Sequence, residues 1–489
     1  MDTDEECEIG LGNQERKLKW HSVYGQILRD RILMAAWQKV KENKGAGGVD
    51  GETIYSYEKN IDANIQSLLQ KLKTKEYKPS PVRRVYIPKK NGNMRPLGIP
   101  TLEDRIVQQA VMDILQPEFE EDIFHRWSCG YRPNLGATRA VQLILWNVET
   151  GYNHIYDCDI RGFFDNIPHK NLMRVLNKYV ADGTVLDMVW QWLKAGYMEE
   201  GKFFDVNSGT PQGGVISPLL ANIYLNELDW KLEEHGIRFV RYADDFLLFA
   251  KTEEEVQKAA QIAKETLQEL GLEVSMEKTR VVDFNKDDFD FLGFTFGHWR
   301  KRKKDGKPYF LAQPKESTWK DFRQKIKANT KKTLTLNPKA WLKRVNPVIR
   351  GKINYFLTIY KAVQANMKYG QKSHCYFNIF GKQLLTIDGY IRQRLRVAMI
   401  HDHPSQRKGH AMKTRWNNEY FARIGLIPAY WLYNSYQYGY TIDQYIDYMK
   451  KKQKKHHANQ VERAKEKGQE YYTPDRVRKI QCAQRLATD

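Results

Sequence analysis

The stretch RFVRYADDFLLFA, residues 238–250, places two adjacent carboxylates, Asp244 and Asp245, inside a run that is otherwise apolar and β-prone. Its β-branched and aromatic residues predict a β-hairpin with a bend at Tyr242 and Ala243. Two adjacent carboxylates repel each other, and burying them is unfavourable unless a partner compensates their charge. A solvated turn is the commonest setting for such a pair, but the apolar flanks argue against it. The hairpin therefore raises the question of which cation faces it.

A second acidic segment lies about 85 residues earlier, in YDCDIRGFFDNI, residues 156–167. Residues 154–164 are predicted to form a strand that carries Asp157 and Asp159, with Asp165 shortly after it. Carboxylates from two rigid segments suit Mg²⁺, which takes oxygen ligands and keeps positions for water and substrate phosphates. Two such ions can activate an attacking hydroxyl and stabilise a leaving pyrophosphate.

The surrounding pattern predicts an α+β arrangement around an antiparallel sheet. Residues 82–100 read as a hairpin around the turn KNGN, and a helix follows with Thr101 as its N-cap and an end near Pro117. Another helix begins at Glu253 and stops at Gly271. After about residue 310 the pattern becomes helical, basic and aromatic.

The charge of the chain is strongly positive, with 79 Lys and Arg against 59 Asp and Glu among 489 residues. Residues 300–350 alone hold 17 Lys and Arg against 3 Asp and Glu. Such an excess indicates a polyanionic partner, usually nucleic acid and less often anionic lipid. Trp319, Phe322 and Trp341 lie among these cations, and this mixture is typical of backbone contact with base stacking. A solvated helix face is the alternative interpretation.

The cysteines are too far apart to form a zinc module, and reduced thiols are the simplest interpretation. They are Cys7, Cys129, Cys158, Cys375 and Cys482. The start of the chain is acidic and lacks the apolar core of a signal peptide. A membrane span is not expected, because no apolar run reaches the required length.

Several stretches, in order along the chain, resemble reverse transcriptases of the group II intron-encoded branch. YADD after FVR resembles their active-site hairpin, and DIRGFFDNIPH (159–169) resembles their first palm aspartate strand. GTPQGGVISPLLANIYLNELD (209–229) is similar to their palm–primer segment, and YIPKKNGNMRPLGIPTLEDRIVQQAV (86–111) to their fingers. The resemblance begins around AWQKVKENKGAGGVDGETI (36–54) and includes NPVIRGKINYF (346–356) in the thumb or maturase region. It covers roughly residues 20–440.

This resemblance implies a right-hand polymerase with fingers, a palm built on an antiparallel sheet, a helical thumb and a basic helical C-terminal region. The implied division is 1–75 for an N-terminal extension and the start of the fingers, 76–150 for the fingers, 151–298 for the palm, 299–400 for a basic thumb and maturase domain, and 401–489 for a DNA- or RNA-binding region with a charged tail. Only Cys375 and Cys482 follow residue 300, so the zinc-linked HNH endonuclease of many relatives is not expected.

The resemblance also implies two Mg²⁺ ions, with Mn²⁺ able to take their place. Asp159 and Asp244 are the implied metal ligands and catalytic residues, with Asp245 as a third acidic member and the backbone carbonyl of Ile160 as a further ligand. Asp157 and Asp165 do not fall on the metal-binding position, and a structural role is expected for them.

The implied deoxynucleotide site includes Phe164, whose ring would leave no room for a 2′-hydroxyl, although core packing is the alternative. The other expected nucleotide contacts are Lys89 and Arg95 as triphosphate clamps, Gln212 near the nascent base pair, and Lys278 near the leaving phosphate. Nucleic-acid contacts are expected at Gly213, Gly214, Lys301, Arg302, Lys303, Lys325, Lys331 and Lys332. For Lys89 and Arg95 the alternative is a solvated hairpin tip without a ligand. For Gly213 and Gly214 the alternative is an ordinary glycine turn.

The implied function is an RNA-directed DNA polymerase encoded by a group II intron, which also binds intron RNA to assist splicing and retrohoming. Its expected partners are the RNA template, the intron RNA, a DNA primer or target and deoxynucleoside triphosphates, with no membrane. The expected setting is the bacterial cytoplasm, in a ribonucleoprotein or at DNA, as a monomer or a homodimer. Two alternatives are a domesticated polymerase of phage defence or DNA repair, and an RNA-binding maturase with vestigial polymerase activity. The intact YADD, Asp159 and PQGG argue against the last, because vestigial sites lose carboxylates first.

Overall fold

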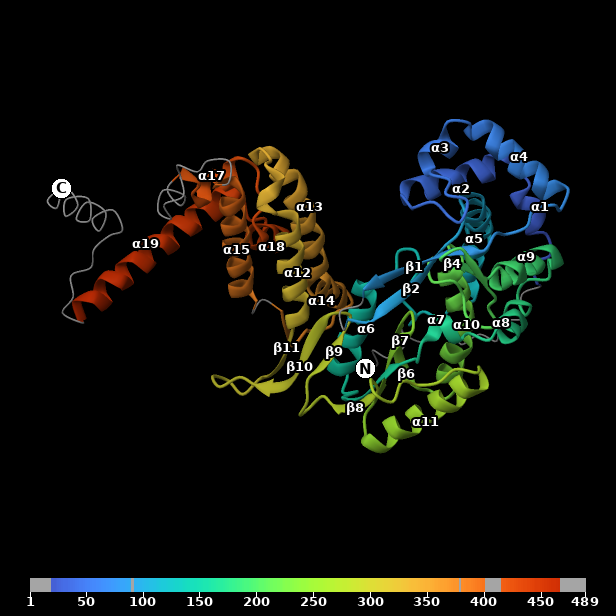
Figure 1. The fold of residues 1–489 in the computed structure, drawn as a ribbon. Coiled ribbons are helices and arrows are strands. Elements are labelled where there is room, and N and C mark those ends of the chain that lie inside the picture. The colour runs from blue at the N-terminus through green and yellow to red at the C-terminus, as the bar shows by residue number, and fades with distance from the viewer. Residues whose placement is uncertain (1–18, 89–91, 378–379, 401–414, 467–489) are drawn as a thin grey trace. The chain divides into compact units, whose positions relative to one another are not determined.

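The computed structural model describes residues 19–88, 92–377, 380–400 and 415–466. The chain folds into two compact units, Met1–Asp283 and Phe284–Asp489 (Figure 1). Both units combine helices with mainly antiparallel strands, so the predicted α+β class is confirmed. Among the described helices, none has the length and apolar character needed to cross a membrane.

The central sheet of the first unit contains the hairpin predicted from residues 238–250. Its strand order is β6-β7-β3-β8, with bounds β3 (His154–Asp159), β6 (Arg238–Tyr242), β7 (Asp245–Ala250) and β8 (Arg280–Asp283). Tyr242 pairs with Asp245, so the bend consists of Ala243 and Asp244, one residue later than predicted. Ala243 takes a φ of 60°, because tight two-residue hairpin turns require a positive φ in their first central residue.

The strand predicted for residues 154–164 is shorter than expected. It ends at Asp159, and Phe163–Asn166 form the short helix α7. The chain leaves the extended conformation because Gly162 takes a left-handed φ of 51°. Phe164 therefore belongs to a helical turn beside the strand end rather than to the strand itself.

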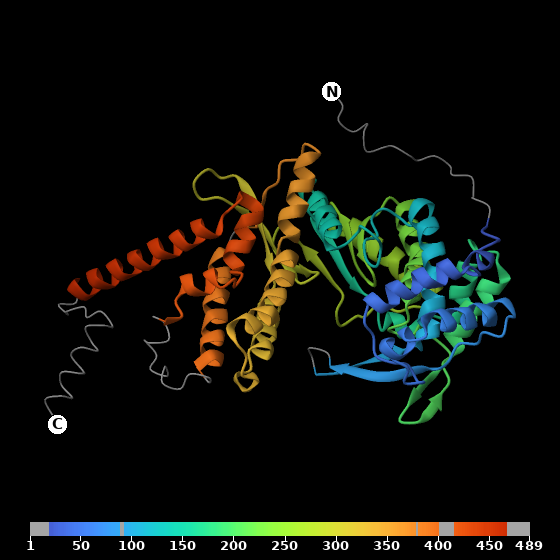
Figure 2. The ribbon, with the colours of Figure 1, turned by 90° about the horizontal axis from the view of Figure 1, so that it is seen from above.

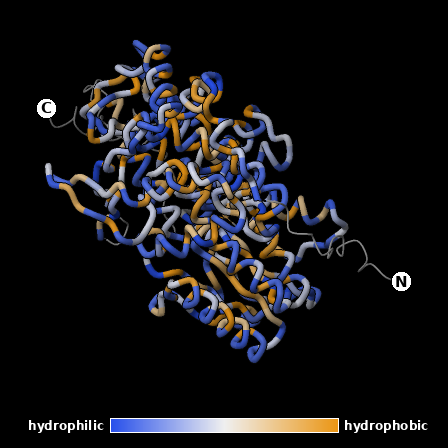
Figure 3. Tube along the Cα trace, turned by 90° about the vertical axis from the view of Figure 1, so that its right-hand side faces the viewer, coloured by the Kyte–Doolittle hydropathy of each residue, from blue (hydrophilic) through white to orange (hydrophobic). Residues whose placement is uncertain are grey.

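Side chains alternate between the two faces of the central sheet, and this alternation separates core from site. Cys158 and Phe246, which pair across β3 and β7, are buried in one apolar core with α10 (Ser217–Glu234) and α11 (Glu253–Glu269). Asp159 and Asp245 also pair, one position along, and therefore lie on the opposite face. Figure 3 shows the hydrophobic segments running through the interior, with hydrophilic turns outside them.

A second sheet of the first unit confirms the predicted hairpin of residues 82–100. Its order is β2-β1-β4-β5, with bounds β1 (Val82–Pro88), β2 (Met94–Ile99), β4 (Tyr197–Glu199) and β5 (Lys202–Phe204). Figure 2 shows the β4–β5 hairpin in green beside the β1–β2 hairpin in blue. The backbone N–H of Gly98 donates to the carbonyl of Gln212 at 2.7 Å, which attaches this sheet to the loop before α10.

The helix predicted after Thr101 is α5 (Leu102–Asp122), and Thr101 caps it as expected. Its predicted end near Pro117 was wrong, since the helix continues for five more residues with Pro117 inside it. Phe119, fully buried and packed against Trp20 and Phe124, explains the continuation, because tertiary packing can offset the hydrogen bond that a proline removes. The remaining helices of this unit are α1 (Tyr24–Ile27), α2 (Asp30–Glu42), α3 (Ile54–Glu58), α4 (Ile61–Lys73), α6 (Ala137–Glu149), α8 (His169–Leu176) and α9 (Gly183–Lys194).

The second unit combines a small sheet with a helical core. The sheet has the order β12-β11-β10-β9, with bounds β9 (Phe289–Phe291), β10 (Phe294–Lys301), β11 (Pro308–Pro314) and β12 (Cys375–Tyr376). The helices are α12 (Glu316–Asn329), η1 (Lys332–Leu334), α13 (Pro338–Phe356), α14 (Thr358–Lys368), α15 (Gly381–Ile400), α17 (Asn418–Arg423), α18 (Ala429–Tyr438) and α19 (Ile442–Glu466). The predicted palm boundary after residue 298 falls inside β10, whose pairing with β9 and β11 places it in the second unit.

The aromatic residues of the basic segment do not lie at its surface. Trp319, Phe322 and Trp341 are buried in the apolar core of the second unit, so their predicted role in base stacking is contradicted. They follow the helical period of α12 and α13, which places them inward while the lysines between them face solvent.

Candidate active site

The carboxylates predicted to form the site come together at one edge of the central sheet. Asp159, the last residue of β3, pairs directly with Asp245, the first residue of β7. Cross-strand partners have Cβ atoms about 5 Å apart, and like charges in this arrangement repel each other. Asp244 occupies the adjoining turn, so all three predicted acidic residues lie within one small region.

The pKa values of Asp244 and Asp245 are both raised, chiefly by burial and further by neighbouring negative charge. Although part of Asp245 reaches solvent, desolvation, followed by the charges of Asp244 and Asp159, raises its pKa to about 7. Desolvation is the largest cause that raises the pKa of Asp244, and the charge of Asp159 raises it further. A cation between such carboxylates would favour their ionised forms, so raised pKa values at neighbouring carboxylates are typical of a cation-binding site.

Lys278 supplies part of the missing charge. Its ammonium lies 2.8 Å from Oδ2 of Asp159, with 66% of the side chain exposed. This hydrogen bond is the largest cause that raises the pKa of Lys278. The structure thus places Lys278 at the carboxylates, on the segment just before β8.

The backbone around Ile160 fixes the direction of its carbonyl. The backbone carbonyl of Asp159 accepts from the N–H of Ser275 at 2.8 Å. The N–H of Arg161 donates to the backbone carbonyl of Glu273, also at 2.8 Å. Successive peptide groups of an extended chain point in opposite directions, so the carbonyl of Ile160 points away from residues 273–275 and toward the β7 side.

These groups fit a divalent ion that takes few protein ligands. Among the residues that the structure describes, no group of three or more His, Cys, Asp or Glu side chains could hold a metal ion by itself. Two carboxylates and one carbonyl match Mg²⁺ once water and substrate phosphates complete its octahedral shell.

A buried polar network fixes the turn that carries Asp244. Arg241, on the core side of β6, forms a bidentate ion pair with Asp229 of α10, and both side chains are completely buried. Nη1 of Arg241 also donates to the carbonyl of Ala243 at 2.9 Å and to Asn222 at 3.0 Å. Sequence reasoning missed this network, although an arginine at a core-facing strand position signals a buried acidic partner.

Among the predicted nucleotide contacts, Phe164, Gln212 and Arg95 belong to the first unit. Phe164 and Gln212 line one cavity of about 330 Å³. The charge of Arg95, on β2, acts on Asp244 and on Tyr131, so Arg95 lies near the carboxylates. Lys89 falls outside the described residues.

The other predicted positions near this site have intramolecular partners. Gln212 donates to Asp165 at 3.1 Å, and Arg280 lies 3.4 Å from Asp157, which agrees with structural roles for both aspartates. A Cβ at Gly213, whose φ is 116°, would lie 2.5 Å from the carbonyl of Gly98, and one at Gly214 would lie 2.6 Å from the hydroxyl of Ser217, so both glycines are closely packed.

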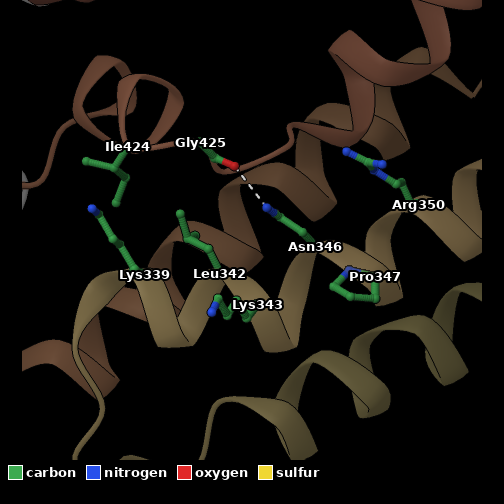
Figure 4. A pocket seen from close by; sticks show the side chains of 8 residues that line it. All are labelled: Lys339, Leu342, Lys343, Asn346, Pro347, Arg350, Ile424 and Gly425. Atoms are coloured by element: carbon green, nitrogen blue, oxygen red, sulfur yellow. Dashed lines mark hydrogen bonds between the residues drawn. The ribbon is translucent and has the colours of Figure 1, made fainter.

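The predicted cations of the second unit lie at its surface. They are Lys301, Arg302, Lys303, Lys325, Lys331 and Lys332. A groove of about 620 Å³, missed by sequence reasoning, carries Lys339, Lys343 and Arg350 along α13 (Figure 4). The amide of Asn346 donates to the carbonyl of Gly425 at 2.9 Å and closes one side of this groove.

Comparison with known proteins identifies the class. Residues 87–296 match the family described as reverse transcriptase (RNA-dependent DNA polymerase). The chain is 35% identical over 317 residues to Protein YkfC of Escherichia coli (strain K12), a match that covers 56% of this chain and 83% of YkfC. The chain therefore belongs to the reverse transcriptase family and is an RNA-directed DNA polymerase. The family implies a right-hand polymerase fold, an RNA template, deoxynucleotide substrates and divalent-metal catalysis.

Two further similarities are narrower. The group II intron-encoded protein LtrA of Lactococcus lactis subsp. cremoris is 40% identical over 222 residues, which cover 45% of this chain and 36% of LtrA. A solved telomerase from Candida albicans aligns at 13% identity and a TM-score of 0.37, over 77% of this chain and 71% of that one. The structural similarity is too low to support an argument about this chain.

Proposed function

We propose that Asp159, Asp244 and Asp245 hold two Mg²⁺ ions at the site of primer extension, with Mn²⁺ able to replace them. The observation that carries this proposal is the direct opposition of Asp159 and Asp245 across β3 and β7, beside the turn of Asp244. Bound divalent ions supply the charge that activates the primer hydroxyl and stabilises pyrophosphate as it leaves. The carbonyl of Ile160, which points away from residues 273–275, is proposed as a further ligand.

The remaining residues of this edge orient the incoming nucleotide. Arg95 binds the triphosphate, and the same role is proposed for Lys89, since cations clamp transferring phosphates. The ring of Phe164 lies under the sugar and excludes a 2′-hydroxyl, while Gln212 contacts the nascent base pair. Lys278, which pairs with Asp159 in this structure, would be free to contact the leaving phosphate if that carboxylate held a divalent ion.

Substitution of one carboxylate tests the site. Asp244→Asn is expected to abolish Mg²⁺-dependent extension of a DNA primer on an RNA template, while RNA affinity remains close to that of the unmodified protein. Asp157→Asn is the matched control, because Asp157 lies two residues before Asp159 on the same strand but pairs with Arg280. Unchanged extension by Asp244→Asn, or equal loss in both variants, would refute the assignment.

We further propose that the enzyme acts in group II intron mobility as a maturase-type reverse transcriptase. The 40% identity to LtrA and the basic surface of the second unit support this role. In it, the second unit binds intron RNA, and the polymerase copies that RNA after insertion into DNA. The bacterial sources of YkfC and LtrA support a bacterial ribonucleoprotein as the setting.

A domesticated polymerase in phage defence or DNA repair is the second candidate. It is favoured by the limited match to LtrA, of which only 36% is covered. The DNA on either side of the gene separates the two roles, because only the first requires a flanking intron ribozyme. Splicing of that flanking RNA with and without the purified protein is the direct assay, and no stimulation would refute the maturase role.

Within the right-hand fold, we assign the β1–β2 hairpin and the helices around it to the fingers and the central sheet to the palm. The helical core of the second unit is assigned to the thumb and maturase domain. α19 is assigned to a C-terminal nucleic-acid-binding region, because only its first turns are buried and its basic remainder is exposed.

A further inference from the structure

Tyr131 has an unusual conformation for a large aromatic residue. Its backbone takes a left-handed φ of 58°, and its side chain is 49% exposed. Left-handed residues other than glycine are uncommon and are unfavourable for bulky side chains. Such strain persists only where the surrounding structure holds it, and it is concentrated at functional sites.

The loop that presents Tyr131 is attached to the catalytic hairpin. The N–H of Cys129 donates to the carbonyl of Arg241 at 2.8 Å, and the N–H of Arg241 donates to Trp127 at 3.0 Å. A Cβ at Gly130 would lie only 2.3 Å from the backbone nitrogen of Ala243. Because only glycine permits this approach, the position of the next residue, Tyr131, is set by the turn that carries Asp244.

The ring of Tyr131 contacts the proposed sugar-contacting ring. It meets Phe164 edge to face, with ring centroids 6.1 Å apart and an interplanar angle of 75°. Burial, followed by the charge of Asp244, raises the pKa of Tyr131, so Tyr131 lies near that carboxylate. Edge-to-face contact restricts how far either ring can tilt.

We propose that Tyr131 is a positioning residue that holds the ring of Phe164 under the sugar of the incoming deoxynucleoside triphosphate and so strengthens discrimination against ribonucleotides. The inference rests on the proposed role of Phe164. It couples sugar selection to the catalytic turn, because one loop contacts both Ala243 and Phe164.

The measured quantity is the ratio of kcat/KM for a deoxynucleotide to kcat/KM for the matching ribonucleotide. Tyr131→Asn and Tyr131→Gly both remove the ring but tolerate a left-handed backbone. Each is expected to lower the ratio about 2- to 10-fold, the range that one aromatic edge contact supports. Tyr131→Phe keeps the ring and is expected to keep the ratio.

A double-variant cycle with Phe164→Val distinguishes the possible failures. Phe164→Val is expected to lower the ratio, and adding Tyr131→Asn is expected to lower it no further, because Tyr131 acts through Phe164. If Phe164→Val leaves the ratio unchanged, the proposed sugar role of Phe164 fails. If Phe164→Val lowers the ratio but Tyr131→Asn and Tyr131→Gly do not, the positioning role of Tyr131 is overturned. It is also overturned if the double variant lowers the ratio by the product of the two single effects. Circular dichroism and primer–template affinity confirm that each variant is folded before the ratio is compared.

Discussion

The buried ion pair between Arg241 and Asp229 provides a test of how the catalytic turn is held. Arg241→Met removes a guanidinium that donates to Asp229 through two nitrogens, and also to Asn222 and Ala243. Both charged side chains have no exposed surface, so the variant leaves the carboxylate of Asp229 buried without its cation.

Breaking one side of a buried pair costs about 3–5 kcal/mol, a large part of the roughly 5–15 kcal/mol that stabilises a typical domain. We expect this loss in urea denaturation followed by circular dichroism. Adding Asp229→Leu removes the orphaned charge, and a buried pair replaced by apolar residues is often as stable as the original. The double variant is therefore expected to recover most of the lost stability.

Primer extension should not recover with stability. The carbonyl of Ala243 accepts from Arg241 at 2.9 Å, and both variants lack that donor. We therefore expect the folded double variant to remain defective in extension, because the turn that carries Asp244 is no longer fixed. If the free energy of unfolding of Arg241→Met lies within about 1 kcal/mol of that of the unmodified protein, the reasoning is refuted, because breaking a buried pair costs more than this. Full extension by the double variant would also refute it.

Two further predictions concern the second unit. Burial raises the pKa of Asp388 to about 6. The folded state therefore binds its proton more tightly than the unfolded state does, and stability from this group falls as pH rises through that value. Between pH 5 and 7 the unmodified protein should lose about 1 kcal/mol that Asp388→Asn does not lose, in urea denaturation at the two pH values; equal changes would contradict the shift. Replacing Lys339, Lys343 and Arg350 by Gln should reduce the slope of log affinity for single-stranded RNA against log salt by about 2, since each phosphate contact contributes about 0.7. An unchanged slope in salt-titrated binding would exclude the groove of α13 from the RNA interface.

Local signals explain which elements the sequence could predict. The helix from Glu253 has both halves of a capping box, Thr252 and Glu255, and ends before Gly271, whose φ is 72°. The hairpin of residues 238–250 has apolar β-prone arms of matching length. These signals depend on neighbours in the chain, so they survive without knowledge of the tertiary fold.

The errors arose where distant contacts outweigh local preference. Pro117 predicts a helix end, but Phe119 packs into a core made by residues far away in the chain. Trp319 and Trp341 look like stacking platforms among lysines, whereas the helical period turns them into the core. A basic aromatic composition alone therefore does not separate a nucleic-acid surface from an amphipathic helix.

The candidate site itself could be predicted only in part, because its geometry depends on strand register. Asp159 and Asp245 are far apart in the chain, and a shift of one residue between β3 and β7 would place one carboxylate on the core face. That register is fixed by the core contacts of Cys158 and Phe246, which pair next to the carboxylates on the opposite face. The apolar residues around YADD thus have two roles. They bury one face of the sheet, and in doing so they bring Asp245 opposite Asp159 on the other.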